Sequence, residues 1–344
     1  MNNYFALALT AITSFLIAFL LGFILIPWLR KLKFGQTILD IGPAWHKSKQ
    51  GTPVMGGLMF IVSVIVSFAV TVAVSFLLKN TDIIGGGALD ASARKIKVYA
   101  GILLAVGFGA IGFLDDYIKV VKKRNKGLSI IQKTIPQLII SLAYLGTIYQ
   151  GGSKYMFIPF VGNTPELGWF FFVFGICVIY GGINAVNFTD GVDGLCASVT
   201  AAASIGFIAI AVLNKFFGMG IVAAALLGGC LGYLIWNWHP AKVMMGDTGS
   251  MFLGGLVVAL AYMIDCPIIL ILIGIIYVIE GMSDVIQIGY FKITHGKRIF
   301  KMAPIHHHFE MCGWKETKIV TVFTVINLVG ALLGAAVIYY GSKF

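Results

Sequence analysis

Long apolar stretches separated by short polar segments dominate this chain. A transmembrane helix needs roughly 20 predominantly apolar residues. On that criterion the pattern predicts ten spans, near residues 5–28, 55–78, 98–114, 134–150, 168–186, 194–213, 219–236, 251–264, 268–291 and 319–340. The first stretch has no basic segment before it and no cleavage site, so it predicts an anchor rather than a signal peptide. The eighth is short and spans only if it continues from the preceding loop.

Composition supports this pattern. The 344 residues are 59% hydrophobic and only 11% charged, with a mean hydropathy of +0.93, whereas soluble domains are about a quarter charged. The expected fold class is therefore an all-α polytopic membrane protein, with residues 1–344 as a single domain. The five cysteines are scattered and odd in number, which argues against a disulfide framework and a zinc site.

Positive charge sets the predicted orientation. If the loop after the first span lies inside and the sides alternate, inside loops hold 18 of the 25 Lys and Arg residues and outside loops hold 7. The positive-inside rule then predicts both termini outside and five loops in the cytoplasm. The rule also accounts for the net charge of +11, so no nucleic-acid partner is expected.

Acidic residues are few and unevenly placed. Of fourteen Asp and Glu residues, five lie in predicted cytoplasmic loops at the mouths of spans: Asp115, Asp116, Asp190, Asp193 and Asp247. One such residue could simply cap a helix. Five on one face indicate function, because carboxylates at a membrane edge are costly. Magnesium binds through one or two carboxylates plus substrate phosphates, so these loops predict phosphoryl transfer at the membrane surface.

Three motifs are expected to be structural or coincidental. "GFGAIG" (107–112) matches a dinucleotide fingerprint but lies inside an apolar span, and "GGCLG" (228–232) has small-residue spacing; both predict helix packing. "NFT" (187–189) matches a glycosylation site only by pattern. The adjacent His306, His307 and His308 cannot easily converge on one ion, which favours phosphate contact or proton handling over metal binding.

Five segments together resemble a known family. They are "GTPVMGG", "GFLDDYIKV", "NAVNFTDGVDGL", "MMGDTGSMFLGG" and "FKMAPIHHHFE". In this order they are similar to the polyprenyl-phosphate N-acetylhexosamine-1-phosphate transferases, over residues from about 46 to 318. The "APIHHHFE" setting resembles the branch that uses UDP-MurNAc-pentapeptide.

That resemblance implies a reaction. Enzymes of this branch transfer phospho-MurNAc-pentapeptide from UDP to undecaprenyl phosphate, giving lipid I and UMP in peptidoglycan synthesis, and they require Mg²⁺. A homodimer in the bacterial cytoplasmic membrane, among membrane lipids and with its active-site cleft facing the cytoplasm, is also implied.

Residue roles carry over position by position. Asp115, Asp116, Asp247 and His306 are expected to be catalytic, with Asp247 as the metal ligand. The expected substrate-binding residues are Lys49, Lys119, Lys133, Asn187, Asp190, Asp193, Asn237, Met244, Gly246, Gln287, His307 and His308.

Two positions depart from the family pattern. Met244 stands where an aromatic residue usually stacks on uracil, and a thioether gives no π overlap. Val54 replaces a usual Thr and removes a hydroxyl. Both are expected to change nucleotide affinity rather than the reaction. The ninth span also carries Glu280, which has a family counterpart, and Asp284, which has no recognised one. We expect this span to bend, or to run out of the bilayer, so that Asp284 and Gln287 reach the cytosolic cleft.

Two alternatives remain open from the residues alone. One is a sister transferase that uses UDP-GlcNAc, against which the full "APIHHHFE" stretch argues. The other is a transporter of an anionic solute. Transporters place ionisable groups near the bilayer midplane, often within inverted repeats, and neither feature is seen in this sequence.

Overall fold

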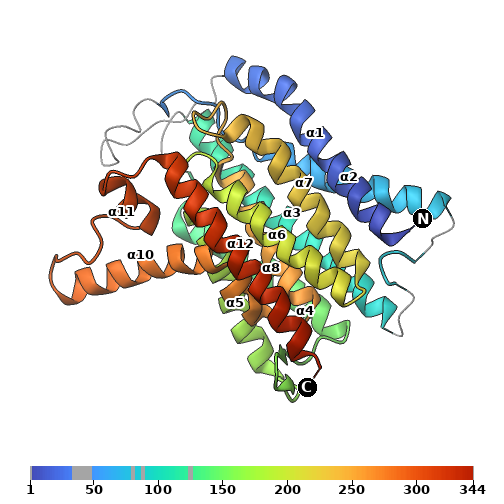
Figure 1. Cartoon of the computed structure of the whole chain (residues 1–344). Helices are drawn as coiled ribbons and strands as arrows, with labels where there is room; N and C mark the ends of the chain where they lie inside the picture. The colour runs from blue at the N-terminus through green and yellow to red at the C-terminus, as the bar shows by residue number, and fades with distance from the viewer. Residues whose placement is uncertain (1, 33–48, 79–81, 87–89, 123–126, 344) are drawn as a thin grey trace.

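The structure is a computed structural model that describes residues 2–32, 49–78, 82–86, 90–122 and 127–343. Within these ranges the chain is helical apart from one two-stranded hairpin (Figure 1). The first half holds α1 (Asn3–Lys31), α2 (Leu58–Leu77), α3 (Ala91–Val121), α4 (Ile130–Gln150), β1 (Phe157–Ile158), β2 (Gly162–Asn163) and α5 (Trp169–Phe188). The second half holds α6 (Leu195–Leu213), α7 (Phe217–Asn237), α8 (Gly246–Met263), η2 (Pro267–Ile269), α9 (Leu270–Ile273), α10 (Ile275–Ile293), α11 (Ile305–Met311) and α12 (Glu316–Gly341).

The membrane-spanning pattern is confirmed in its coarse form. Eight described helices are long and apolar enough to cross a membrane, and the bent unit of η2, α9 and α10 raises the number to nine. The fourth predicted span falls on α4, which is a 21-residue helix but is not among these eight. The prediction of ten spans is therefore supported only as eight or nine.

Burial separates a protein-enclosed core from a lipid-facing rim. In α8, 89% of the most apolar window is buried, against 28% in α1. The outer surface of α1 carries exposed apolar side chains such as Phe5, Phe23 and Ile24, as a helix in contact with lipid should. Helix α8 begins at Gly246, five residues before the predicted start of the eighth span, so this span does continue from the preceding loop.

Small residues set the closest helix contacts. A Cβ on Gly112 of α3, in the 107–112 motif, would lie 2.1 Å from the Asp247 carbonyl oxygen on α8. A Cβ on Gly228 of α7 would lie 2.1 Å from the carbonyl oxygen of Ala11 on α1. Both glycine motifs are therefore helix-packing motifs, as predicted.

The ninth predicted span bends sharply. Helix α10 makes an angle of 94° with the segment Pro267–Ile273, and the break is at Gly274. In Figure 1 α10 runs outward from the bundle toward α11. A bend in this span is therefore confirmed, and Gln287 binds the backbone of residues 299 and 300. The position of Asp284 and Gln287 in the cleft stays a prediction.

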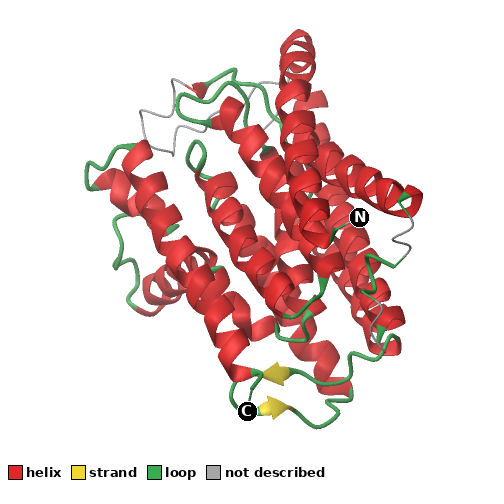
Figure 2. Ribbon diagram, turned by 45° about the vertical axis from the view of Figure 1, so that its right-hand side comes forward, coloured by secondary structure: helices red, strands yellow, loops and turns green. Residues whose placement is uncertain are grey.

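The bundle has two distinct ends. We call the end with Asp116 and Asp247 the carboxylate end, and the end with Lys97 and Asp265 the opposite end. The β1–β2 hairpin, which pairs Phe157 with Asn163, lies at the opposite end near the C-terminus (Figure 2). Both described termini lie there as well, because Gly341 accepts a hydrogen bond from Phe160 and the Tyr4 ring packs on Phe217.

Candidate active site

Three carboxylates meet at the carboxylate end. Asp115 and Asp116 stand near the C-terminal end of α3, and Asp247 stands in the first turn of α8. Each offers an oxygen atom, and these atoms lie within 4.8 Å of one another. The two helices approach closely because Gly112 has no side chain: a Cβ there would be 2.1 Å from the Asp247 carbonyl oxygen.

Asp116 caps helix α8 from a neighbouring helix. Its carboxylate accepts hydrogen bonds from the Asp247 N–H at 3.2 Å, the Thr248 N–H at 2.9 Å and the Thr248 hydroxyl at 2.7 Å. These bonds satisfy N–H groups that the first turn of a helix leaves without partners. Gly246 must be glycine here: its φ is +69°, and a Cβ would lie 2.4 Å from the Asp116 Oδ2 atom. Asp116 is therefore held rigidly, with 2% of its surface exposed.

Asp115 is also engaged by the protein. Its Oδ1 atom accepts the Leu128 N–H at 2.8 Å, and its Oδ2 atom pairs with the Lys119 amino group. The same amino group lies 3.8 Å from Asp116 and 3.2 Å from Asp247. One lysine thus contacts all three acids of the cluster.

Asp247 is the most accessible of the three acids, with 19% of its side chain exposed. The Lys133 amino group contacts its Oδ2 atom at 2.8 Å. Asn187 donates to its Oδ1 atom at 2.9 Å and to the Ser250 hydroxyl at 2.7 Å. Carboxylate oxygens at this spacing suit a magnesium ion. In this structure the amino groups of Lys119 and Lys133 neutralise part of the negative charge of the three acids. These acids could therefore hold a metal ion.

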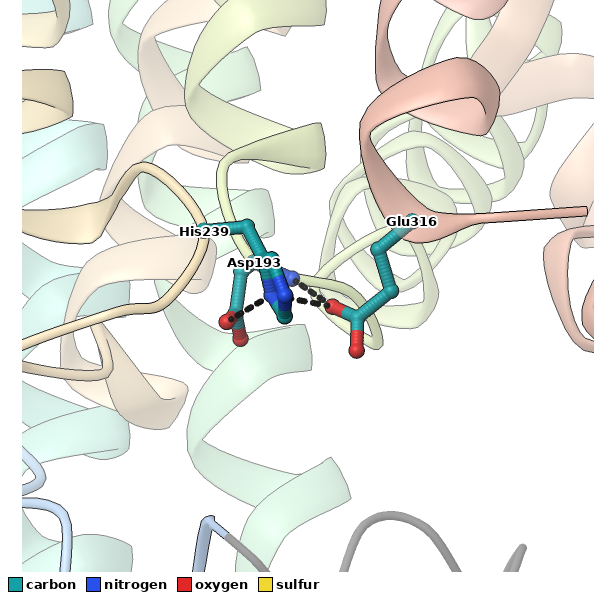
Figure 3. Close-up of side chains that lie close together, drawn as sticks. All are labelled: Asp193, His239 and Glu316. Atoms are coloured by element: carbon teal, nitrogen blue, oxygen red, sulfur yellow. Dashed lines mark hydrogen bonds and ion pairs between the residues drawn. The ribbon is translucent and has the colours of Figure 1, made fainter.

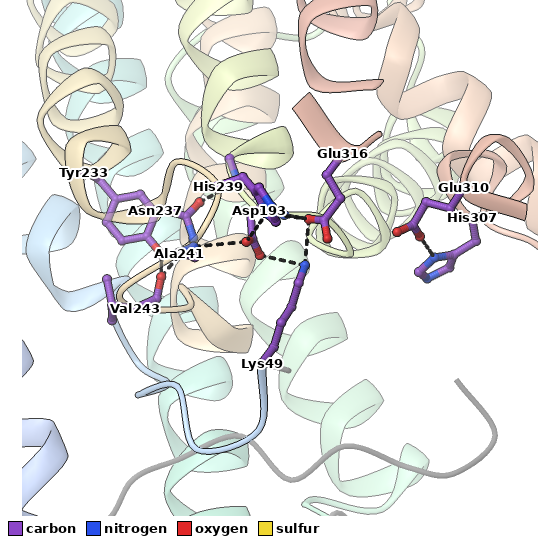
Figure 4. A network of polar contacts seen from close by, with 11 residues as sticks. Lys49, Asp193, Tyr233, Asn237, His239, Ala241, Val243, His307, Glu310 and Glu316 are labelled. Carbon is purple, nitrogen blue, oxygen red and sulfur yellow. Dashed lines mark hydrogen bonds and ion pairs between the residues drawn. The ribbon is translucent and has the colours of Figure 1, made fainter. Parts of the chain in front are cut away.

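A second polar group surrounds Lys49 beside the loop between α5 and α6. The Lys49 amino group lies 2.8 Å from Asp193 and 2.7 Å from Glu316 (Figure 4). Burial alone would lower the pKa of Lys49, but the hydrogen bonds to Asp193 and Glu316 and the charges of these carboxylates together outweigh burial, so the pKa is raised. Burial also raises the pKa of Asp190 well above its usual range, and the charges of Asp247, Asp116 and Asp193 add to this.

Two members of this second group were missed by sequence reasoning. His239 and Glu316 both contact Asp193 (Figure 3). Their contacts join residues up to 123 positions apart in the sequence. The signal that could have found Glu316 is the scarcity of acids, since it is one of only fourteen.

Two predicted substrate-binding amides bind protein backbone in this structure. Asn237 is 2% exposed; it accepts the Gly194 N–H and donates to the Val243 carbonyl oxygen (Figure 4). Gln287 accepts from the Ile299 and Phe300 N–H groups and donates to the Phe300 carbonyl oxygen. Each amide thus joins two separate segments of the chain, and their contact with substrate stays a prediction.

The three adjacent histidines have three different partners. His306 is fully buried; its Nδ1 atom lies 3.0 Å from Glu280, and a Cβ on Gly191 would be 2.1 Å from its Nε2 atom. His307 pairs with Glu310 at 2.6 Å. His308 accepts the Lys301 N–H at 3.1 Å. The three rings therefore do not point to one common ligand position. The buried ring of His306 packs against Gly191, in the loop between α5 and α6.

Met244 lies in an extended segment beside the cluster. Its N–H donates to the Pro53 carbonyl oxygen at 2.8 Å, and its carbonyl oxygen accepts the Gly56 N–H at 2.8 Å. The segment 49–57 therefore supports the chain just before Asp247.

Comparison with known proteins agrees with this geometry. Residues 98–265 match the model of glycosyl transferase family 4. A phospho-N-acetylmuramoyl-pentapeptide-transferase of Halalkalibacterium halodurans is 46% identical over 328 residues, covering 95% of this chain and 96% of the relative. Relatives of the same name from Bacillus thuringiensis and Bacillus cereus are 44% identical over 337 residues, covering 97% of this chain and 98% of each relative.

The apolar helices and the match of residues 98–265 thus indicate a polytopic membrane protein of a transferase class. The similarity over nearly the whole chain then gives the family. The chain belongs to the phospho-N-acetylmuramoyl-pentapeptide-transferase family.

Proposed function

We propose that this protein transfers phospho-MurNAc-pentapeptide from UDP-MurNAc-pentapeptide to undecaprenyl phosphate, forming lipid I and releasing UMP, with Mg²⁺ as cofactor. The observation that carries the proposal is the setting of Asp247. It is the most accessible acid of a three-carboxylate cluster, and Lys119, Lys133 and Asn187 surround it. Phosphoryl transfer needs this combination of metal-binding oxygens and phosphate-binding cations at one point.

The residues divide the work of the transfer. Asp247, with Asp115 beside it, would hold the metal ion, which supplies positive charge against the diphosphate. Lys119 and Lys133 would then turn to phosphate oxygens and stabilise the charge that develops in the transition state. Asp116 holds the first turn of α8, and so the position of Asp247, by accepting its three hydrogen bonds.

Direct attack by the lipid phosphate is the proposed route. A phosphate monoester has a second pKa of about 6, so it is already largely dianionic at neutral pH and needs little help from a base. The alternative is a covalent intermediate on an aspartate. The three donors on Asp116, and the Leu128 N–H and Lys119 on Asp115, support direct attack because a carboxylate nucleophile would have to leave them.

Isotope exchange distinguishes the two routes. In enzyme stripped of polyprenyl phosphate, labelled UMP should not enter UDP-MurNAc-pentapeptide. Rapid exchange without lipid, lost on replacing Asp115 or Asp116, would establish the covalent route instead.

An apolar groove supports a lipid substrate. A cavity of about 420 Å³ lies between α5, α8 and α10, with Tyr180, Val257 and Val285 in its lining. Asn184 also lines it and stands three residues before Asn187 on α5. An isoprenoid chain in this groove would bring its phosphate toward the carboxylate end.

The proposed orientation places the carboxylate end in the cytoplasm and both termini outside, in the cytoplasmic membrane of a bacterium. The charge asymmetry of the loops supports it. Single cysteines at Ser129 and Asn163, both exposed, in a cysteine-free background should label from opposite sides. Labelling of both from the cytoplasmic side would refute this topology.

Activity in detergent tests the function itself. Purified enzyme with undecaprenyl phosphate and Mg²⁺ should release UMP from UDP-MurNAc-pentapeptide but not from UDP-GlcNAc. Release from UDP-GlcNAc alone would identify the sister transferase, and no release from either would favour a transporter. The proposed homodimer is tested by light scattering of the protein in detergent.

A further inference from the structure

Beside the carboxylate cluster lies a second set of ligand-type side chains. Asp193, His239 and Glu316 come from three separate elements: the loop before α6, the loop after α7 and the first residue of α12 (Figure 3). Their ligand atoms lie within 4.8 Å of one another. Such a set could bind a cation, and in this structure the cation is the Lys49 amino group (Figure 4). Lysine thus takes the role that a metal would otherwise have.

The set is closely connected, and apart from His239 it is largely buried. The exposed fraction is 2% for the Asp193 side chain and 11% for the Lys49 and Glu316 side chains, against 42% for the His239 side chain. The Asp193 Oδ2 atom accepts the Ala241 N–H at 3.0 Å and lies 3.0 Å from the His239 Nδ1 atom. A buried charge is stable only when it is paired, so these contacts depend on one another.

Glu316 makes the connection to helix α12. Its Oε2 atom contacts the Lys49 amino group at 2.7 Å and accepts the Asp193 N–H at 3.2 Å. One carboxylate oxygen therefore fixes both the amino group of Lys49 and the backbone of Asp193.

Lys49 in turn begins the segment that supports Asp247. Residues 49–57 pair with the chain after His239: Met244 N–H with Pro53 O at 2.8 Å, Gly56 N–H with Met244 O at 2.8 Å, and Gly57 N–H with Met245 O at 3.1 Å. Asp247 follows two residues after Met245. A shift of Lys49 would therefore be passed by backbone pairing to the metal-binding carboxylate.

We propose that Glu316 is a positioning residue for the transfer reaction: it holds Lys49, and through Lys49 the segment 49–57 and Asp247. The proposal rests on the proposed function, including its use of Mg²⁺. Glu316 does not need to touch substrate in this role. Its loss should weaken metal use by the enzyme rather than remove a catalytic group.

The test compares Glu316→Gln, Lys49→Met and the double variant with wild type. Glu316→Gln keeps an acceptor for the Asp193 N–H but removes the charge that holds Lys49. We expect kcat/KM to fall about tenfold, the lower end of the loss found when a residue that orients a metal ligand is removed. The Mg²⁺ concentration for half-maximal UMP release should rise several-fold. In the Lys49→Met background, Glu316→Gln should cause no further loss, since both act through one contact.

The control is Glu166→Gln, which removes an exposed acid that pairs with Lys154 at 3.3 Å. It should leave the Mg²⁺ dependence unchanged. If Glu316→Gln only lowers the unfolding temperature and matches the control in Mg²⁺ dependence, its role is structural and the proposal fails. Losses that multiply in the double variant would also overturn it.

Two further outcomes are separable. If Glu316→Gln does not fold, Glu316→Asp keeps the charge and moves it by one methylene. Its Mg²⁺ half-saturation should rise above the wild-type value, and this rise should disappear in the Lys49→Met background; a rise that persists there overturns the proposal. A wild-type enzyme that releases no UMP would refute the proposed function itself, whereas an active wild type with a normal Glu316→Gln variant would refute only the positioning role.

Discussion

The two ends of the bundle hold their charges in different ways. At the opposite end, each ion pair between described residues joins one base to one acid. The pairs are Lys97 with Asp265 at 2.6 Å, Lys95 with Asp82 at 2.6 Å, Arg94 with Asp90 at 3.0 Å and Lys154 with Glu166 at 3.3 Å. At the carboxylate end, Lys119 alone contacts three acids, and Lys49 contacts two.

This difference distinguishes ion pairs that only stabilise the fold from a charged cluster that is suited to binding a metal ion. One-to-one pairs neutralise charge and need nothing further, and exposed pairs of this kind add little to stability. Among the described residues of the carboxylate end, acids exceed the lysines that contact them. A surplus of buried negative charge costs free energy, and a bound cation offsets that cost. The excess of acidic side chains over lysines therefore indicates the end of the bundle where a metal ion and phosphates are expected to bind.

The largest expected effect comes from removing one acid of the three-carboxylate cluster at the carboxylate end. Asp247→Asn should lower the rate of UMP release by on the order of 10²-fold or more, because it removes the most accessible ligand of the proposed metal. UMP release over a range of Mg²⁺ concentrations measures this. Asp265→Asn at the opposite end is the control and should keep turnover per folded enzyme. Wild-type turnover of Asp247→Asn at low Mg²⁺ would show that Asp247 is not the ligand.

A smaller effect, on stability rather than rate, is expected at the opposite end. Lys97→Met should lower the free energy of unfolding by about 2 kcal/mol, less than for a fully buried pair because Asp265 is 26% exposed. Thermal unfolding in detergent measures the change, and Lys97→Arg should restore most of it. If Lys97→Met lost turnover but kept its unfolding temperature, the opposite end would influence catalysis at the carboxylate end, and the comparison would fail.

A still smaller effect concerns nucleotide binding at the carboxylate end. Met244→Phe should tighten UMP binding by roughly 0.5–1.5 kcal/mol, because a ring can form an offset stack with uracil. Calorimetric titration with UMP measures the dissociation constant. An unchanged or larger constant would mean that this side chain does not face the base.

The smallest effect is expected where a single pair is exposed. Lys154→Met removes the contact with Glu166, whose side chain is 52% exposed. Neither turnover nor the unfolding temperature should change measurably, because water already solvates both charges. A clear drop in unfolding temperature would contradict the view that the opposite end contributes mainly through its buried pair.

Sequence reasoning was most successful where the signal is local. Apolar runs predict helices because the bilayer leaves backbone groups no other partner, and the sharp bend in the ninth span was expected from Glu280, Asp284 and Gln287 in one apolar run. The number of membrane spans was predicted less well. Helix α4 carries Gln132, Lys133 and Gln137, and it is not among the described helices that are apolar enough to cross a membrane.

The candidate acids were also found from sequence, since five carboxylates recur at the mouths of spans. Their separate tasks were not. Asp115 and Asp116 are neighbours in sequence, yet one binds Leu128 and Lys119 while the other caps α8. Adjacent helical side chains point in directions about 100° apart, so the packing of α3 decides what each meets.

By itself, therefore, the sequence determined a helical membrane protein, the positions of its spans and the acidic loops that mark its function, because periodicity and charge act along the chain. The tertiary structure alone decided which distant groups meet. Thr248 reaches Asp116 across 132 positions, and Glu316 reaches Asp193 across 123. Such contacts depend on how closely helices pack, and that is set by glycines such as Gly112 and Gly246, whose neighbours no local pattern reveals.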